Sequence, residues 1–248
     1  MDDLFVKQVR IVEHEDLNNE YPFCINLIQN FSSLTFEKPV SFFVGENGVG
    51  KSTFVEALAV ALGLNAEGGT ENFHFHTQET HSQLYQYLKV SKGILRPQTK
   101  FFLRAESFYN VASEIDSIAA DDSVMYKGYG GKSLHDCSHG ESFMQLMMSR
   151  FSKHGLYLLD EPEAALSPSR QLALLVLIDD LVKGGSQFII STHSPILLSY
   201  RDALIYDLNH NFQKVNFKDT DIYQTYKLVL DNPEGMQHHL FDDKDSKE

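Results

Sequence analysis

The sequence predicts an α/β domain built on a mixed or parallel β-sheet. Two apolar runs without alternation, residues 155–160 and 187–192, are typical of strands that are covered on both faces. A strong helical pattern at 167–183 separates these two runs. A third apolar run, 40–44, leads directly into glycines and then into another helical stretch. Strands that alternate with helices in this way favour parallel strands joined by helical crossovers.

The N-terminal half is expected to contain both strands and helices. The segment 51–63 is apolar nearly all round, which predicts a buried helix, and Gly63 is placed to cap its end. A further helix is expected near 80–92. Short segments rich in β-branched or aromatic residues predict strands at 4–12, 23–28, 40–44 and 100–105.

The C-terminal half continues the alternation. Residues 108–135 are polar and lack long periodic runs, and a helix opens in "SHGESFMQLMMSR" and ends near Gly155. The later elements, besides those already named, are expected to be a helix near 195–201, a hairpin of 203–208 with 213–217, and a helix at 220–231.

These elements predict a single domain over residues 1–248. Its α/β core is expected at about 1–107 and 151–231, with a mainly helical insert at about 108–150. Residues 232–248 are expected to be a polar tail.

Composition and charge limit the function classes. The chain of 248 residues has a net charge of −13, which does not support a broad nucleic-acid surface. Cys24 and Cys137 lie far apart and predict neither a disulfide framework nor a metal spacing. No signal segment and no run of the roughly 20 apolar residues that a membrane span requires is apparent. The sequence therefore predicts a cytoplasmic protein without a membrane span.

The stretch "GENGVGKS", Gly45–Ser52, matches the phosphate-binding pattern G-x-x-x-x-G-K-[ST] between an apolar strand and a buried helix. Glycines let the backbone curl around a phosphate chain and point N–H groups inward. Lys51 is expected to reach the β- and γ-phosphates, and the Ser52 hydroxyl to bind Mg²⁺. The residues expected to bind ATP are Glu46, Asn47, Gly48, Val49, Gly50, Lys51, Ser52 and Thr53.

Two carboxylates follow the apolar run in "LYLLDEPE". An acid at the end of a strand completes the Mg²⁺ shell in a P-loop protein, so Asp160 is the expected second metal ligand. Glu161 then lies beside the metal and is the expected general base for an attacking water. The plainer alternative is a solvated strand end without a chemical role.

His193 follows the strand at 187–192 in "QFIISTHSP". A histidine at the mouth of such a sheet can hydrogen-bond a γ-phosphate and hold the attacking water in line. It is the second expected catalytic residue, and a purely structural role is the alternative.

In this order the motifs resemble the ATP-binding cassette (ABC) ATPases, whose P-loop is followed by a signature helix, two Walker B acids and a switch histidine. The segment "SHGES" resembles the family's signature Leu-Ser-Gly-Gly-Gln, with Ser138, His139, Gly140 and Glu141 at its last four positions. The resemblance implies that these residues cap the γ-phosphate of ATP bound to a second copy, giving a head-to-tail homodimer. A simple helix cap by Ser138 and Glu141 is compatible with that role.

The sequence departs from the family pattern after the strand near 100–105. "LRAESFYN" stands where the family places a Mg²⁺-binding glutamine, so Glu106 or Ser107 is the candidate substitute, and Glu106 is the third candidate metal ligand. The family also places an aromatic residue on adenine, for which Tyr21 and Phe23 are candidates, with core packing as the alternative for both. The whole chain resembles most the small ATPases of the RecF-, SMC- and OLD-like branch without a coiled coil.

Three functions remain. The first is an ATP-hydrolysing homodimeric switch that acts on an unidentified protein partner, in DNA maintenance or in defence against phage. The second is the nucleotide-binding subunit of a membrane transporter. The third is an ATP-sensing module that does not hydrolyse. The segment "AALSPSRQ" and the missing glutamine favour the first over the second, and Glu161 with His193 favour it over the third.

Overall fold

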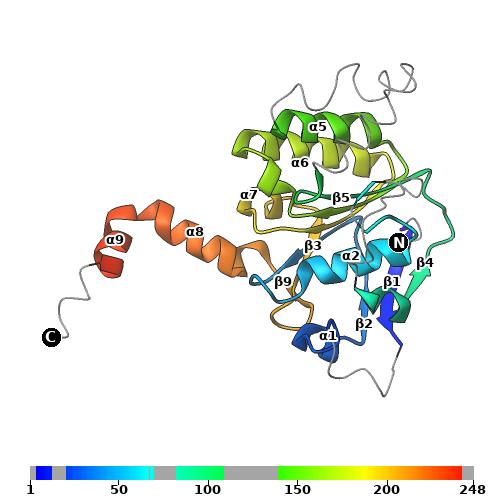
Figure 1. Cartoon of the computed structure of the whole chain (residues 1–248). Helices are drawn as coiled ribbons and strands as arrows, with labels where there is room; N and C mark the ends of the chain where they lie inside the picture. The colour runs from blue at the N-terminus through cyan, green and yellow to red at the C-terminus, as the bar shows by residue number, and fades with distance from the viewer. Residues whose placement is uncertain (1–3, 13–20, 67, 70–81, 109–138, 242–248) are drawn as a thin grey trace.

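The computed structural model describes residues 4–12, 21–66, 68–69, 82–108 and 139–241. These residues form a six-stranded sheet and a smaller three-stranded sheet, with helices packed around them (Figure 1). The order in the large sheet is β5-β6-β7-β3-β8-β9. Its strands are β5 (Thr99–Arg104), β6 (Gly155–Asp160), β7 (Gln187–Ser191), β3 (Val40–Val44), β8 (Ala203–Asp207) and β9 (Gln213–Val215).

The large sheet is mixed, as the sequence predicts. Five strands run parallel, and β9 at the edge pairs antiparallel with β8. In the smaller antiparallel sheet, β1 (Val6–Ile11) lies between β2 (Ser33–Thr35) and β4 (Leu88–Lys92). The carboxyl ends of β3, β6 and β7 therefore meet at one edge of the large sheet, which is where ligands bind in open α/β folds.

Helices cover both faces of the large sheet. On one face lie α5 (His139–Arg150), α6 (Pro168–Lys183) and α7 (Pro195–Leu198), and on the other lies α2 (Lys51–Ala61) with the small sheet (Figure 1). Side chains alternate along each strand, so Phe42 packs in the cluster beneath α5 and α6, whereas Phe43 packs in the cluster beneath α2. This double coverage explains why the strands are continuous apolar runs.

The strand predicted at 23–28 is wrong. Residues 21–25 form turns and α1 (Asn26–Asn30) follows them. Phe23, Leu27 and Ile28 are all buried in the cluster beneath α2. A short apolar run does not distinguish a buried strand from a buried helical turn, and here no neighbouring strand pairs with this segment.

The helix predicted near 80–92 is also wrong over the described residues 82–92. A short 3₁₀ helix, η1 (Gln83–Tyr87), is followed by β4, which pairs antiparallel with β1 in the register Val9↔Val90 and Ile11↔Leu88. The buried residues Leu84 and Leu88 have helical spacing, which is why the sequence favours a helix. Pairing with β1 overrides that local preference because it satisfies the backbone and buries Leu88.

The other predicted elements are confirmed to within a few residues. The helix at 51–63 ends at Ala61, and Gly63 has φ of 85°, the left-handed conformation of a glycine that caps a helix. The hairpin of β8 and β9 and the helix at 220–231 are present. The helix near 195–201 is shorter, α7, because it ends at Leu198. The insert predicted at 108–150 lies largely outside the described residues, apart from residue 108 and α5.

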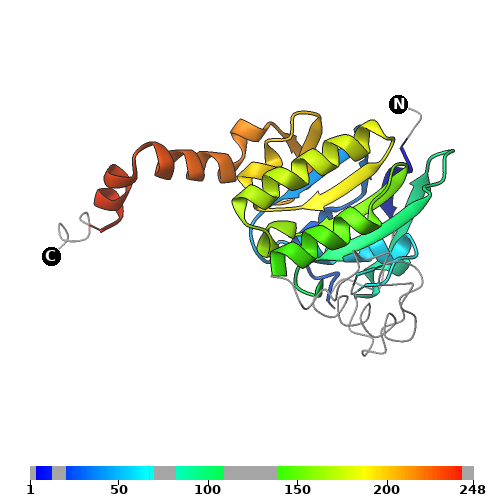
Figure 2. The same cartoon turned by 90° about the horizontal axis from the view of Figure 1, so that it is seen from above.

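The described chain ends in two helices that project away from the rest of the molecule (Figures 1 and 2). They are α8 (Asp221–Asp231) and α9 (Pro233–Phe241), and α9 occupies part of the segment expected to be a polar tail. In the part of the chain that the structure describes, no helix combines the length and apolarity needed to cross a membrane.

We expect Phe54→Ala to lower the free energy of unfolding by about 3–5 kcal/mol, because it removes a ring at the centre of an aromatic cluster. Phe54 is fully buried and its ring centroid lies 5.0 Å from that of Phe31 and 4.8 Å from that of Phe212. Urea unfolding measures the loss. Leu172→Ala is the control, since Leu172 is 57% exposed, and an equal loss in both variants would contradict the assignment.

Candidate functional site

The P-loop joins β3 to α2 and wraps around the side chain of Lys51. Gly48 and Gly50 have φ of 83° and 108°, left-handed conformations that residues with a Cβ rarely adopt. The Lys51 ammonium donates hydrogen bonds to the carbonyl oxygens of Gly45 at 2.8 Å and Glu46 at 3.0 Å. The loop is thus folded around the cation that the sequence assigns to phosphate.

The electrostatics of Lys51 favour an anionic ligand. Its side chain is buried, and burial lowers the pKa of the ammonium because it disfavours the charged form. The carboxylates of Glu161, Asp160 and Glu163 act in the opposite direction and favour the charged form. A phosphate chain bound in the loop would supply further negative charge next to this ammonium.

Ser52 and Asp160 meet at the carboxyl end of β6. The Ser52 hydroxyl donates to Oδ1 of Asp160 at 3.1 Å, and the Ser191 hydroxyl donates to the same oxygen. Asp160 is only 2% exposed, and burial raises the pKa of its carboxyl group against these hydrogen bonds. A hydroxyl and a carboxylate oxygen fit the hard-ligand preference of Mg²⁺, which completes its shell with phosphate and water oxygens. Ser52 and Asp160 are therefore the two residues that would hold it.

Glu161 and His193 face each other next to Ser52 and Asp160. Nε2 of His193 lies 3.8 Å from Oε1 of Glu161. This distance is too long for a hydrogen bond, but it places both groups beside the same space. Glu161 has a left-handed backbone, φ 48° and ψ 51°, which turns its side chain out of the strand direction. Within the described residues, Nε2 of His193 is buried without a hydrogen-bond partner. Burial and the Lys51 charge lower the pKa of His193, which favours its neutral form.

The first turn of α5 packs against the segment that follows Glu161. Gly140 is buried, and a Cβ placed there would lie 2.8 Å from the carbonyl oxygen of Ala165 and 2.6 Å from Nη1 of Arg170. The Glu141 carboxylate is 57% exposed and pairs with Nη2 of Arg170 at 3.0 Å. Ser138 lies outside the described residues. The signature-like segment thus presents Glu141 outward while Gly140 fixes the helix to its own subunit.

The two candidate adenine-stacking residues lie in different environments. Phe23 is 8% exposed and packs edge-on against Tyr87 with ring centroids 5.0 Å apart, so it belongs to the core. Tyr21 is 65% exposed, and its hydroxyl shares a hydrogen bond of 2.9 Å with the Thr53 hydroxyl at the start of α2. Of the two, only Tyr21 has a ring free to take a base beside the P-loop.

Comparison with protein families identifies the chain. A family described as "AAA domain" matches residues 22–148, just over half of the chain, and a second, described as "AAA domain, putative AbiEii toxin, Type IV TA system", matches residues 133–199. The chain belongs to the first of these families. With its P-loop, strand-end acids and signature helix, it is a member of the ABC-type P-loop ATPase superfamily.

Individual relatives are distant. An uncharacterized ABC transporter ATP-binding protein of Haemophilus influenzae is 24% identical over 238 residues, covering 86% of this chain and 88% of the relative. Among solved structures, CbiO1 of Clostridium perfringens, part of the ABC transporter complex CbiONQ, is 16% identical over 96% of this chain and 99% of that one, with a TM-score of 0.48. The SMC head domain of Thermotoga maritima is 17% identical over 82% and 94%, with a TM-score of 0.43.

Sequence reasoning missed Arg104, the cation beside Asp160 in this ABC-type ATPase domain. β5 pairs with β6 in the register Arg104↔Asp160, which places the guanidinium against the acid. Its Nε lies 3.2 Å from Oδ2 of Asp160 and its Nη1 lies 2.9 Å from Oε2 of Glu56. Glu106, 84% exposed, reaches Nη2 at 3.4 Å and lines a cavity of about 160 Å³ together with Ser52 and Asp160.

Glu163 was also missed, although it is the third acid of "DEPE". Its buried carboxylate accepts hydrogen bonds from the Thr192 hydroxyl at 2.7 Å and from the backbone N–H of His193. Burial raises the pKa of this carboxyl group, and the two hydrogen bonds lower it. Glu163 therefore ties the segment after β6 to the segment after β7 and positions His193 rather than acting on a ligand.

We expect Arg104→Met to destabilise the protein by about 1–3 kcal/mol at neutral pH, because it leaves the buried carboxylate of Asp160 without its counter-ion. Without Arg104 the folded-state pKa of Asp160 rises further above its unfolded value of about 3.9. The loss of stability is then largest at neutral pH and disappears as pH falls through the raised folded-state pKa of Asp160, because the protonated acid needs no counter-ion.

Urea unfolding at several pH values measures this loss. Lys214→Met is the control, because it breaks a surface ion pair that contributes little to stability: the side chains of Lys214 and Glu37 are 48% and 42% exposed. A loss for Arg104→Met that does not depend on pH would contradict the pairing with Asp160.

Proposed function

We propose that this chain hydrolyses ATP with Mg²⁺ and acts as a stand-alone conformational switch that closes into a head-to-tail homodimer when ATP binds. The observation that supports it best is the meeting of Lys51, Ser52, Asp160, Glu161 and His193 at the carboxyl edge of one sheet. These side chains come from three separate strands and their loops. A structural role alone gives no reason for a buried cation, a buried acid and an unpartnered imidazole nitrogen to meet there.

The chemistry follows from the roles of these groups. The P-loop amides and Lys51 would hold the β- and γ-phosphates, while Ser52 and Asp160 would hold Mg²⁺, which supplies positive charge beside those oxygens. Glu161 would accept a proton from water as its oxygen bonds to the γ-phosphorus and the bond to the β-phosphate oxygen breaks. Neutral His193 would orient that water or donate to the γ-phosphate.

The dimer is proposed from the position of the N-terminal end of α5, called here the α5 tip. In one chain the P-loop amides serve its own nucleotide, so the backbone N–H groups at the start of α5 would have a phosphate to bind only on another copy. Arg170 partly neutralises the Glu141 carboxylate beside them. Loss of the γ-phosphate would then remove the contact between subunits and open them. Because α5 packs on the segment after Glu161, hydrolysis and the signature tip are adjacent within each subunit.

A second candidate is the nucleotide-binding subunit of a transporter, which is favoured by the name of the Haemophilus relative. The residues at and after the end of β5 speak against a transporter subunit. The glutamine that couples such subunits to their membrane partner is missing there, and Arg104 pairs with Glu106 instead. A switch turns over ATP by itself, whereas a transporter subunit needs its membrane partner for full activity. The description of the second matched family, a putative toxin of a type IV TA system, favours a role in defence, with DNA maintenance as the alternative. Proteins that co-purify with an ATP-trapped variant identify the partner.

We expect Glu161→Gln to abolish ATP turnover while retaining ATP binding, because the amide cannot accept the proton from water. The trapped variant accumulates the closed assembly, so a form of it that is monomeric without nucleotide should double its mass on addition of ATP–Mg²⁺. Phosphate release measures turnover, and light scattering on a sizing column measures mass.

The matched control is Ser138→Arg in the Glu161→Gln background, which places a bulky side chain at the signature tip. It should bind ATP in the same way without the change in mass. A Glu161→Gln protein that is monomeric without nucleotide and stays monomeric at saturating ATP–Mg²⁺ would refute the head-to-tail dimer.

We expect Tyr21→Ala to weaken binding of both ATP and ADP, because an aromatic ring stacked on a base contributes about 1–3 kcal/mol. Tyr21→Phe keeps the ring and loses only the hydrogen bond to Thr53, so its affinity should stay near that of the wild type. Titration of a fluorescent adenine nucleotide measures both. Equal losses in the two variants would assign the effect to the hydroxyl instead of stacking.

A further inference from the structure

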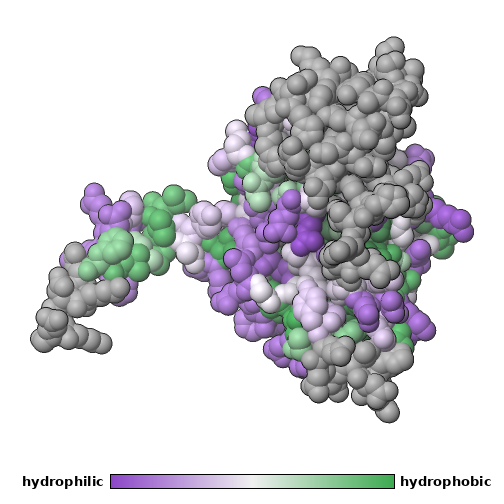
Figure 3. Space-filling model, viewed as in Figure 1, coloured by the Kyte–Doolittle hydropathy of each residue, from purple (hydrophilic) through white to green (hydrophobic). Residues whose placement is uncertain are grey.

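The helices α8 and α9 form an arm that extends away from both sheets (Figures 1 and 2). Neither helix buries a residue, although the arm is rich in large apolar side chains (Figure 3). The exposed ones are Tyr226 (51%), Leu228 (55%), Val229 (40%), Leu230 (74%), Leu240 (49%) and Phe241 (68%). So much apolar surface on a projecting helix pair marks an interaction surface.

Most of the apolar side chains of α8 form one stripe. Tyr223, Tyr226, Val229 and Leu230 follow the three- and four-residue spacing that places side chains on the same face of a helix. Leu228 is displaced from this stripe and faces the other side of the helix. α8 is therefore amphipathic in the manner of a helix that packs against a partner.

The base of α8 is held by contacts with the segment that precedes it, and these contacts fix the direction in which the helix projects. The Thr220 hydroxyl caps α8 by accepting from the Tyr223 N–H at 3.2 Å, and it donates to the carbonyl oxygen of Phe217 at 2.7 Å. The rings of Phe217 and Tyr223 meet edge-on with centroids 4.9 Å apart. Thr220 is 4% exposed, and it lines a cavity of about 150 Å³ with the P-loop residue Glu46 and with His193.

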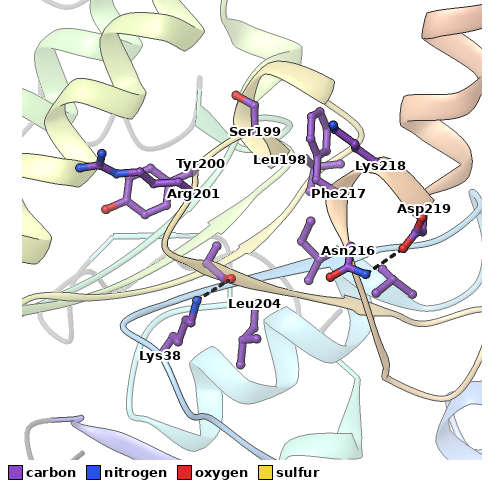
Figure 4. A pocket seen from close by; sticks show the side chains of 13 residues that line it. Lys38, Leu198, Ser199, Tyr200, Arg201, Leu204, Asn216, Phe217, Lys218 and Asp219 are labelled. Atoms are coloured by element: carbon purple, nitrogen blue, oxygen red, sulfur yellow. Dashed lines mark hydrogen bonds between the residues drawn. The ribbon is translucent and has the colours of Figure 1, made fainter.

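A groove of about 680 Å³ lies beside the base of the arm (Figure 4). Phe217 forms part of its wall, and because Phe217 also contacts Tyr223, the groove continues the stripe of α8. Three basic side chains line the groove, Lys38, Arg201 and Lys218, against one acidic side chain, Asp219. The groove thus combines apolar and basic side chains, and Arg201 among the basic ones pairs with Asp202 at 3.3 Å.

The occupant that fits both surfaces is a second copy of the chain. The described part of the arm carries the opposite charge, with Asp221, Asp231 and Glu234 against Lys227, which pairs with Asp231 at 2.7 Å. A two-fold axis across the stripe would place two α8 helices antiparallel and bring Glu234, in the first turn of α9, toward the basic groove of the other copy. A stable interface buries roughly 800 Å² per partner, which is more than one helical stripe provides, so the contact of α9 with the groove is required.

We propose that two copies associate without nucleotide through antiparallel pairing of their α8 helices, with α9 of each copy seated in the groove of the other. This interface is separate from the ATP-dependent contact through α5. Because the base of the arm lines a cavity with Glu46 and His193, the paired arms lie beside both nucleotide sites.

The test is the mass of the nucleotide-free protein, measured by sedimentation at micromolar concentration. The wild type should be a dimer, and Val229→Asp combined with Leu230→Asp should be a monomer because it places charge within the stripe. Leu228→Asp is the matched control, since the same substitution on the other side of the same helix should leave the dimer intact. Circular dichroism and thermal melting verify that both variants are folded like the wild type.

A second variant tests the groove independently. Lys218→Glu reverses one of the basic charges of the groove and should raise the dimer dissociation constant by about tenfold or more at low salt, with a smaller effect at high salt. A wild type that is monomeric without nucleotide, or a stripe variant that is still a dimer, overturns the proposal.

The arm and the nucleotide-dependent contact can be separated in one protein. In the Glu161→Gln background, the Val229→Asp and Leu230→Asp substitutions should give a monomer without nucleotide and a dimer with ATP–Mg²⁺. If this protein stays monomeric with ATP while the parent forms the nucleotide-free dimer, the arm interface stands and the ATP-dependent dimer fails.

Discussion

The buried carboxylate of Asp160 is the constraint on which the rest of the structure depends. A charge taken out of water needs compensation on every side, and here it comes from the Ser52 and Ser191 hydroxyls and the Arg104 guanidinium. These partners come from α2, β7 and β5, so one acid ties the P-loop helix to two strands of the sheet. The parallel register makes this possible, since it aligns Arg104 and Ser191 directly beside Asp160.

The same edge explains how the chemistry and the larger conformation are connected. Glu163 joins the segment after β6 to that after β7 through Thr192 and His193. The α5 tip rests on the neighbouring backbone at Ala165, and the base of α8 lines a cavity with His193. The two surfaces proposed for contact with other subunits therefore both begin at the nucleotide edge. A displacement of a few tenths of an ångström there would be transmitted through packed backbone instead of through mobile loops.

The local sequence pattern was sufficient to predict those elements whose conformation is set by the local sequence. The P-loop glycines, the apolar strands that end in Asp160 and His193, and the capping of α2 at Gly63 follow from backbone conformation and burial, which short segments encode. The segments 23–28 and 82–92 could not be assigned in this way. Phe23, Ile28, Leu84 and Leu88 are buried, but the conformation of the two segments depends on whether β1 and the α2 face of the sheet offer a partner, which is a long-range condition.

By itself the sequence determined the fold class, the identity of the phosphate loop and the strand ends at which chemistry is expected, because each rests on spacing within about ten residues. Only the tertiary structure decided which side chains meet. Strand register brings Arg104 to Asp160, and the two neighbouring loops after β6 and β7 bring Glu163 to His193. Packing also buries Phe23 while Tyr21 is exposed, and it leaves the apolar stripe of α8 uncovered. These facts depend on the packing of segments distant in the chain, which no short pattern records.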